Sequence, residues 1–294
     1  MAQQSVVSWL CKCAITALAL LLACGVATAL VGSRLQMPAT TTRDGTLATL
    51  NRYVEALTPD IVLAGSSMTF RLREEYFASP SLRNVALSGG SPITGLEVVL
   101  SQPRVPRLIL VETNVISRDA DEALAARYAH GRSLEPRFIR PIRAAVAAYE
   151  NWRHASPTHA QVVAEMDRLL KAPPSDFDSR LYLERMLASF DQDPATAAQA
   201  NADRLLDLAG QARRRGARVL LFELPYPARL ETTRWVEVTR NVVHARFPDP
   251  AQWLPIDVDT AQLRWLDGIH LDDRSAMLVS RSIERAVGLL AKPD

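Results

Sequence analysis

Four short apolar runs, separated by helix-like segments, constrain the fold of this chain more than any other feature of its sequence. The runs cover residues 61–64, 82–87, 108–112 and 218–223 and are rich in Ile, Val and Leu. Short continuous apolar strands that alternate with helices are typical of a mostly parallel sheet with both faces buried. The sequence therefore predicts an α/β protein with a three-layer α/β/α, doubly wound fold, whose ligands bind at the carboxyl ends of the strands.

Helical patterns fill the segments between these strands, and one long segment interrupts the alternation. Residues 118–195 are rich in Ala and Arg and are broken by several prolines, which predicts a helical insertion over or beside the site. The insertion is expected to act as a lid, to shape a substrate site, or to serve only as a structural cap. The other expected elements are helices at 46–57, 68–76, 93–100, 203–215 and 273–290 and a weaker fifth strand at 253–258.

The N-terminal segment is apolar over a length that suits a membrane. No charged residue occurs between Lys12 and Arg34, and a helix over this stretch would span roughly 30 Å, the thickness of a bilayer core. An uncleaved anchor with Lys12 on the cytoplasmic side follows the positive-inside rule. Two alternatives stay open: a signal peptide cleaved at Ala27-Thr28-Ala29, and a lipoprotein signal with Cys24 lipidated.

All three interpretations place the remainder of the chain outside the cytoplasm. We expect a single-pass protein of the inner (cytoplasmic) membrane, with residues 1–33 as anchor or signal segment, 34–45 as linker and 46–294 as a periplasmic catalytic domain. The cysteines all lie in or beside the apolar segment, so the exported portion has no disulfide framework. The net charge of +2 gives no electrostatic reason to expect a nucleic-acid partner.

Polar residues that suit acyl transfer follow the predicted strand ends. Ser67, Gly89 and Asn114 each come just after such an end, and Asp267 and His270 share one short loop near the C-terminus. A serine, an imidazole and a carboxylate supply the nucleophile, general base and orienting acid of a serine enzyme. The rival elbow of α/β-hydrolases needs Gly-x-Ser-x-Gly, and the sequence fails it because position 69 is Thr.

In order along the chain, these segments resemble the blocks of the SGNH (GDSL-like) hydrolase and acyltransferase superfamily. The resemblance implies a flavodoxin-like fold, with Ser67 as the nucleophile and not its neighbour Ser66. It implies an oxyanion hole that includes Gly89 and Asn114, and a catalytic Asp267 and His270. The matching segments are Gly65-Ser66-Ser67, Asn84 to Gly89, Thr113-Asn114 and Asp267-Gly268-Ile269-His270.

Three positions depart from the usual pattern of that superfamily. Ser66 stands in place of an Asp, Glu112 in place of a Gly, and Val115 in place of an Asp. A serine in the first block is similar to the membrane-anchored branch, which includes proteins that O-acetylate alginate and other exopolysaccharides and one that assists D-alanylation of teichoic acid.

This likeness implies an O-acetyltransferase that acts on an exported or cell-surface polysaccharide through an acyl-serine intermediate. The acyl acceptor would be a cell-envelope glycan, and a membrane-bound partner would supply the acyl donor because acetyl-CoA is not available outside the cytoplasm. Two alternatives stay open: an esterase that removes acyl groups from glycans or lipids, and a non-catalytic glycan-assembly protein.

The sequence contains few residues that suggest contact with a substrate, a metal ion or a cofactor. Trp265, beside the Asp-His loop, is the tryptophan best placed to contact substrate. The remaining histidines lie in helical or loop contexts without ligand spacing: His130, His154, His159 and His244. The sequence therefore predicts no metal site and no cofactor.

Overall fold

The computed structural model describes residues 2–31, 42–55, 57–129, 149, 153 and 158–288. The chain divides into two compact units. One unit, residues 1–40 and 134–158, contains the N-terminal helix α1 (Ala2–Val31). The other unit, residues 41–133 and 159–294, is the α/β domain that carries every candidate site residue.

Helix α1 contains an apolar stretch from Val6 to Val26 with a mean hydropathy of 2.1. None of this stretch is buried against other parts of the structure. Its 21 residues would extend over about 30 Å as a helix. The helix is therefore long and apolar enough to cross a membrane, as the sequence indicated.

A four-stranded parallel sheet forms the centre of the α/β domain. The strand order is β2-β1-β3-β4, with bounds β1 (Ile61–Ala64), β2 (Leu82–Asn84), β3 (Leu108–Glu112) and β4 (Arg218–Phe222). The order places β1 and β3 in the middle, so the residues that follow these two strands leave the sheet at the centre of its carboxyl edge.

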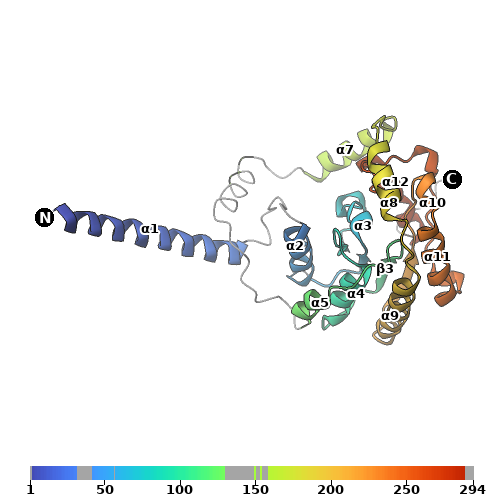
Figure 1. Ribbon diagram of the computed structural model, residues 1–294, viewed down its shortest axis with the longest axis horizontal. Coiled ribbons are helices and arrows are strands. Elements are labelled where there is room, and N and C mark those ends of the chain that lie inside the picture. Colours follow the sequence, from blue (N-terminus) through green and yellow to red (C-terminus); the bar gives the residue numbers. More distant parts are fainter. Residues whose placement is uncertain are drawn as a thin grey trace. The chain divides into compact units, whose positions relative to one another are not determined.

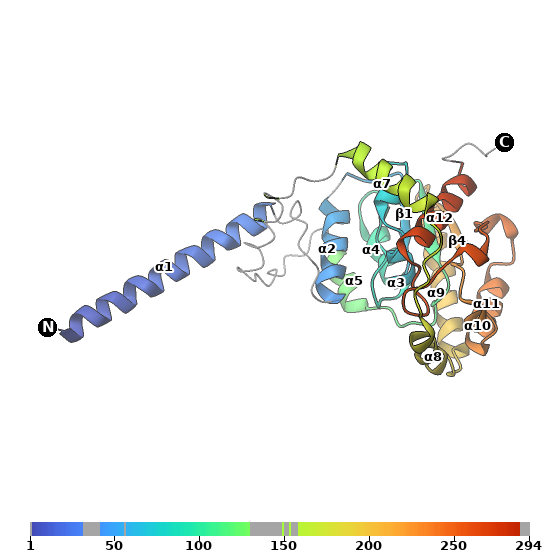
Figure 2. The same cartoon turned by 90° about the horizontal axis from the view of Figure 1, so that it is seen from above.

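Helices cover both faces of this sheet (Figures 1 and 2). Alternate strand residues belong to two separate buried clusters, because side chains in a strand point to opposite faces in turn. The first cluster includes residues of α2 (Thr42–Glu55), α4 (Pro92–Ser101), α5 (Glu122–Tyr128), α9 (Ala195–Arg214) and α11 (Arg234–Arg246). The second includes residues of α3 (Ser67–Phe70), α7 (His159–Lys171), α10 (Ala228–Glu231) and α12 (Asp273–Ala286). The prediction of an α/β fold with a parallel sheet between helices is therefore confirmed (Figure 1).

Two expected elements are wrong. The single helix expected at 68–76 is instead the short α3 followed by a separate 3₁₀ turn, Glu74–Tyr76. The Asn84 amide donates to the carbonyls of Thr69 and Leu72, which satisfies the end of α3 without further helix. The fifth strand at 253–258 is reduced to one bridge between Trp253 and Leu221.

The expected insertion is described only in part. Helix α5 opens it, and α7 and α8 (Arg180–Ser189) lie in its second half. Residues 130–157, apart from 149 and 153, lie outside the described residues. Its predicted end at 195 coincides with the start of α9, which is longer than the helix expected at 203–215.

The turn between β1 and α3 has no room for a side chain at Gly65. A Cβ placed there would lie 2.5 Å from the Thr69 side chain and 2.7 Å from Glu112 Oε2. We therefore expect Gly65→Ala to lower the free energy of unfolding by about 1–3 kcal/mol through overpacking.

Gly210 offers a matched control inside helix α9. The nearest atom to a Cβ there is Arg214 Nη1 at 3.5 Å, so Gly210→Ala should stabilise the helix by up to about 1 kcal/mol. Urea unfolding of the full chain in detergent, followed by circular dichroism, measures the change in unfolding free energy for both substitutions. Equal effects of the two substitutions would contradict the close approach at Gly65.

Candidate active site

The two adjacent serines after β1 have different surroundings. Ser66 is fully buried and caps α3, since its Oγ accepts from the Met68 N–H at 3.2 Å and donates to Glu112 at 2.8 Å. Ser67 begins α3 and is half-buried. Its hydroxyl makes no hydrogen bond within the described part of the chain. The Ser66 hydroxyl is therefore engaged in hydrogen bonds that hold the turn. The Ser67 hydroxyl makes no such bond among the described residues and could act as a nucleophile.

Glu112, the last residue of β3, holds this turn with its carboxylate. The side chain is fully buried and accepts hydrogen bonds from Ser66 N (2.8 Å), Ser66 Oγ (2.8 Å), Thr69 Oγ1 (2.6 Å) and Thr69 N (3.3 Å). Such a buried carboxylate is tolerated because converging donors replace its hydration. Ser66 and Glu112, two of the positions that depart from the SGNH pattern, are thus bonded to each other. Nothing in the spacing of these two positions, which are 46 residues apart, predicts this bond.

Asp267 and His270 lie on a tight loop and form a hydrogen-bonded pair. The His270 Nδ1 atom is 2.7 Å from Asp267 Oδ2, and the His270 backbone N–H donates to Asp267 Oδ1 at 3.0 Å. A carboxylate only accepts, so Nδ1 carries the proton and Nε2 is left as the basic nitrogen. Gly268 turns the loop with a φ of +87°, which glycine adopts without strain.

The electrostatics of the pair favour an ionised Asp267. Burial alone would raise the pKa of Asp267, but hydrogen bonds from the His270 ring and backbone, the charge of His270 and a bond from the Ile269 N–H outweigh it. The pKa of Asp267 is consequently held below its ordinary value. An ionised carboxylate can orient the imidazole and stabilise a positive charge that forms on it.

Contacts with α3 bring the Asp-His loop to the serine turn. Arg71, which caps the end of α3, donates from Nε to the Leu271 carbonyl at 3.0 Å and from Nη2 to Asp273 at 2.9 Å. Met68 of α3 also shares a buried cluster with Ile269 and Leu271. Two segments about two hundred residues apart are therefore packed together, as the sequence predicted.

The hydrogen bond between serine and imidazole is not formed in this structure. The His270 Nε2 atom is buried and has no hydrogen-bond partner among the described residues, so the Ser67 hydroxyl does not reach it. In proteins without substrate such bonds are often long and tighten only on binding. The site thus contains a preformed Asp-His pair and a separate serine on the neighbouring turn.

Asn114 follows β3 and joins it to the segment after β4. Its amide donates to the Leu224 carbonyl at 2.8 Å, and its Oδ1 accepts from the Leu224 N–H at 2.7 Å. The Tyr226 hydroxyl donates to the Asn114 carbonyl at 3.0 Å, and burial raises the pKa of Tyr226, which keeps this donor neutral. Asn114 therefore has a clear structural role, and one N–H of its amide makes no hydrogen bond among the described residues.

Gly89 lies in an exposed turn with a φ of +73°, and its N–H makes no hydrogen bond within the described ranges. The segment that leads to it runs beside the serine turn, since Leu87 donates to the Gly65 carbonyl at 2.9 Å. Trp265 is half-buried at the base of the Asp-His loop, and its indole N–H has no acceptor among the described side chains and backbone.

The second half of the insertion packs on the Asp-His loop. A Cβ at Gly268 would lie 2.7 Å from the Leu183 Cα atom, so α8 touches the loop backbone directly. Ser175 donates to Asp272 at 3.1 Å, and its carbonyl accepts from Arg264 at 3.1 Å. These contacts place the described second half of the insertion against the Asp-His loop.

Comparisons of the chain with protein-family models, with curated proteins and with solved structures find no match. The site is accordingly defined by its own geometry, an α/β domain with a serine turn and an Asp-His pair at the carboxyl edge of a parallel sheet.

Removal of the buried carboxylate tests its role at the serine turn. Glu112→Ala leaves the buried donors of Ser66 and Thr69 without an acceptor, at a cost of about 1–3 kcal/mol for each unsatisfied group. Glu122→Ala is the control because the Glu122 side chain is 77% exposed, and it should change stability by less than about 0.5 kcal/mol. Urea unfolding compares the two, and a Glu112 variant as stable as the control would contradict the account of the turn.

Asn114→Ala should affect both stability and chemistry. The buried N–H and carbonyl of Leu224 lose their partner, so unfolding should become easier by about 1–3 kcal/mol. Acyl transfer should fall by roughly 10²–10³-fold through loss of an oxyanion donor. Hydrolysis of p-nitrophenyl acetate at a temperature where the variant stays folded separates the two effects. Unchanged turnover there would exclude the oxyanion role.

Proposed function

We propose that this protein is a serine-dependent acyltransferase of the SGNH type, which moves acyl groups, most simply acetyl, to an exported or cell-surface polysaccharide. One observation carries the proposal: an unengaged Ser67 hydroxyl lies on a turn that Arg71 ties to the loop bearing the Asp267–His270 pair. The strand order β2-β1-β3-β4 also agrees with the beginning of a flavodoxin-like sheet.

In the proposed reaction, Ser67 Oγ attacks the carbonyl carbon of an ester donor while His270 Nε2 takes the hydroxyl proton. Asp267 stabilises the imidazolium. The leaving alcohol takes that proton as the tetrahedral intermediate collapses, which leaves an acyl-Ser67. An acceptor hydroxyl then loses its proton to His270 and attacks the acyl group. As the second tetrahedral intermediate collapses, the bond from the acyl carbon to Ser67 Oγ breaks and Ser67 Oγ takes that proton back from His270, which restores both residues.

Developing negative charge on the carbonyl oxygen needs preorganised donors. In this proposal the donors are the backbone N–H groups of Ser67 and Gly89 and the second amide N–H of Asn114. The Glu112 carboxylate fixes the turn that carries the Ser67 N–H, and the hydrogen bonds to Leu224 fix the Asn114 amide.

The location belongs to the same proposal. Helix α1 would anchor the protein in the inner membrane by a single pass, with the α/β domain in the periplasm. A membrane-bound partner would present the acyl donor there, and a cell-envelope glycan would accept the acyl group.

A non-catalytic role in glycan assembly is the second candidate, because His270 Nε2 has no bond to Ser67 or to another described residue. A protein of this kind would keep the fold and the Asp-His pair without turnover. Esterase activity would need the same residues as the transferase and differs only in whether water takes the acyl group.

Substituting each of the two serines by alanine in turn distinguishes the structural role of Ser66 from the catalytic role proposed for Ser67. Ser67→Ala should abolish labelling by a fluorophosphonate probe and lower turnover on the order of 10⁶-fold, with stability unchanged, because its hydroxyl bonds to no described residue. Ser66→Ala should retain labelling but unfold more easily by about 1–2 kcal/mol, since it removes a helix cap. Labelling that survives in Ser67→Ala and disappears in a folded Ser66→Ala would overturn the assignment.

An acceptor assay separates transfer from hydrolysis. The full chain in detergent, given p-nitrophenyl acetate and neutral oligosaccharides, should yield acetylated sugar that depends on Ser67. Ser67-dependent release of acetate that no oligosaccharide diverts would instead favour the esterase. No labelling and no turnover in the folded protein would favour the non-catalytic role.

A further inference from the structure

A cavity of about 630 Å³ opens at the carboxyl end of β4, beside the candidate active site. Its walls come from the segment after β4, from α10 and α11, and from residues 256–265, which lead into the Asp-His loop. This volume falls within the range of sites that bind small molecules. Neither Ser67 nor His270 lines it, so the cavity is a separate feature, and its wall at Trp265 belongs to the segment that leads into the Asp-His loop.

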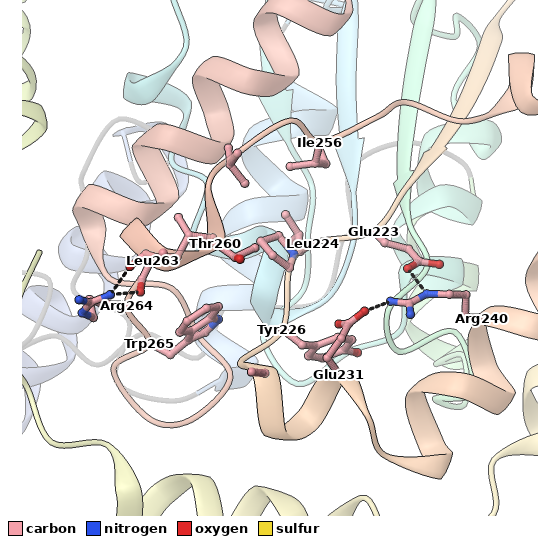
Figure 3. Close-up of a pocket in the computed structure, with 14 residues that line it drawn as sticks. Glu223, Leu224, Tyr226, Glu231, Arg240, Ile256, Thr260, Leu263, Arg264 and Trp265 are labelled. Carbon is pink, nitrogen blue, oxygen red and sulfur yellow. Dashed lines mark hydrogen bonds and ion pairs between the residues drawn. The ribbon is translucent and has the colours of Figure 1, made fainter.

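One wall carries a charge network in which one guanidinium, that of Arg240, pairs with two carboxylates. Arg240 donates from Nε to Glu223 Oε2 at 2.7 Å, and its Nη2 lies 2.7 Å from Glu231 Oε1 (Figure 3). The guanidinium keeps further N–H donors and Glu231 keeps its second oxygen as an acceptor, whereas Glu223 Oε1 lies 3.6 Å from His244 Nε2. Because both signs of charge are present and paired, the wall suits hydroxyl groups better than it suits a phosphate or another strong anion.

The opposite side of the cavity is mainly apolar apart from Arg264, whose guanidinium donates to the carbonyls of Ser175, Ala261 and Leu263. Trp265 lies across the cavity from Arg240, and Leu224, Tyr226 and Ile256 line the space between them (Figure 3). An aromatic face opposite paired charged groups matches an amphipathic ring whose C–H faces are apolar and whose edge bears hydroxyls.

The cavity shares structural elements with both halves of the candidate site. Tyr226, in its wall, donates to the Asn114 carbonyl at 3.0 Å. Trp265 pairs with Leu271 as a β-bridge, and the adjacent Leu266 N–H donates to the His270 carbonyl at 2.8 Å. A ligand held here would therefore contact residues that are bonded to Asn114 and to the loop that bears His270.

We propose that this cavity binds a neutral sugar unit of a glycan, with its hydroxyls on the Glu231–Arg240–Glu223 network and a ring face on Trp265. That the bound glycan is the acyl acceptor rests on the proposed function, whereas the binding itself does not. The sugar unit held in the cavity would be next in the glycan chain to the sugar unit that is acylated, because Ser67 and His270 do not line the cavity.

The test uses full-length Ser67→Ala protein in detergent, so that no probe is consumed. Neutral tetrasaccharides of glucose, mannose, galactose and N-acetylglucosamine are titrated, with a uronic acid tetrasaccharide as the charged comparison, by tryptophan fluorescence and saturation-transfer NMR. We expect at least one neutral tetrasaccharide to bind. Glu231→Gln, which keeps the side-chain shape, and Trp265→Ala should each weaken that binding by about tenfold or more.

Glu184→Gln is the matched control, because Glu184 forms an exposed ion pair with Arg229 and does not line the cavity. It should leave binding unchanged. No binding of any neutral tetrasaccharide would overturn the proposal, as would preference for the uronic acid probe or binding that Glu231→Gln leaves intact. Binding of this kind in Ser67→Ala, together with a folded wild-type protein that no fluorophosphonate labels, would support the cavity while rejecting the acyltransferase.

Discussion

The buried carboxylate of Glu112 is the contact on which the geometry around Ser67 depends. It comes from the end of β3 and binds the N–H and hydroxyl groups of Ser66 and Thr69 on the turn after β1. The close packing leaves no room for a side chain at Gly65. A charge in a dry interior is tolerated only while its donors stay in place, so this contact fixes where the first turn of α3 begins.

The remainder of the candidate site is attached to this centre by a few polar contacts. Arg71 joins the end of α3 to the Asp-His loop, and Asn114 joins the ends of β3 and β4. Two residues that line the cavity beside β4 are bonded to these segments: Tyr226 donates to the Asn114 carbonyl, and Trp265 forms a bridge with Leu271 at the end of the Asp-His loop. Ser67, the Asp267–His270 pair and a cavity therefore follow the strands of a single parallel sheet. That arrangement suits the transfer of a group between two bound molecules.

The sequence predicts the four strands of the sheet, although β2 ends at Asn84 and the expected fifth strand is only a bridge. It predicts the polar contacts between the strands poorly. β1 and β3 could be predicted to the residue because a continuous apolar run has one stable environment in an α/β protein, a strand buried on both faces. The helix expected at 68–76 is wrong because its end is decided by the distant Asn84. The Asp267–His270 pair follows from local spacing, whereas the bond between Ser66 and Glu112 joins positions 46 residues apart and depends on the strand order.

The central claim is that Ser67 is the nucleophile and that His270 activates it. The most direct measurement is peptide mapping by mass spectrometry after the full-length protein reacts with p-nitrophenyl acetate and is quenched in acid, in wild type and in His270→Ala. The account predicts an acetyl group on Ser67 in the wild type and none in the variant. An acetyl group on Ser66, or one on Ser67 that forms equally well without His270, would contradict it.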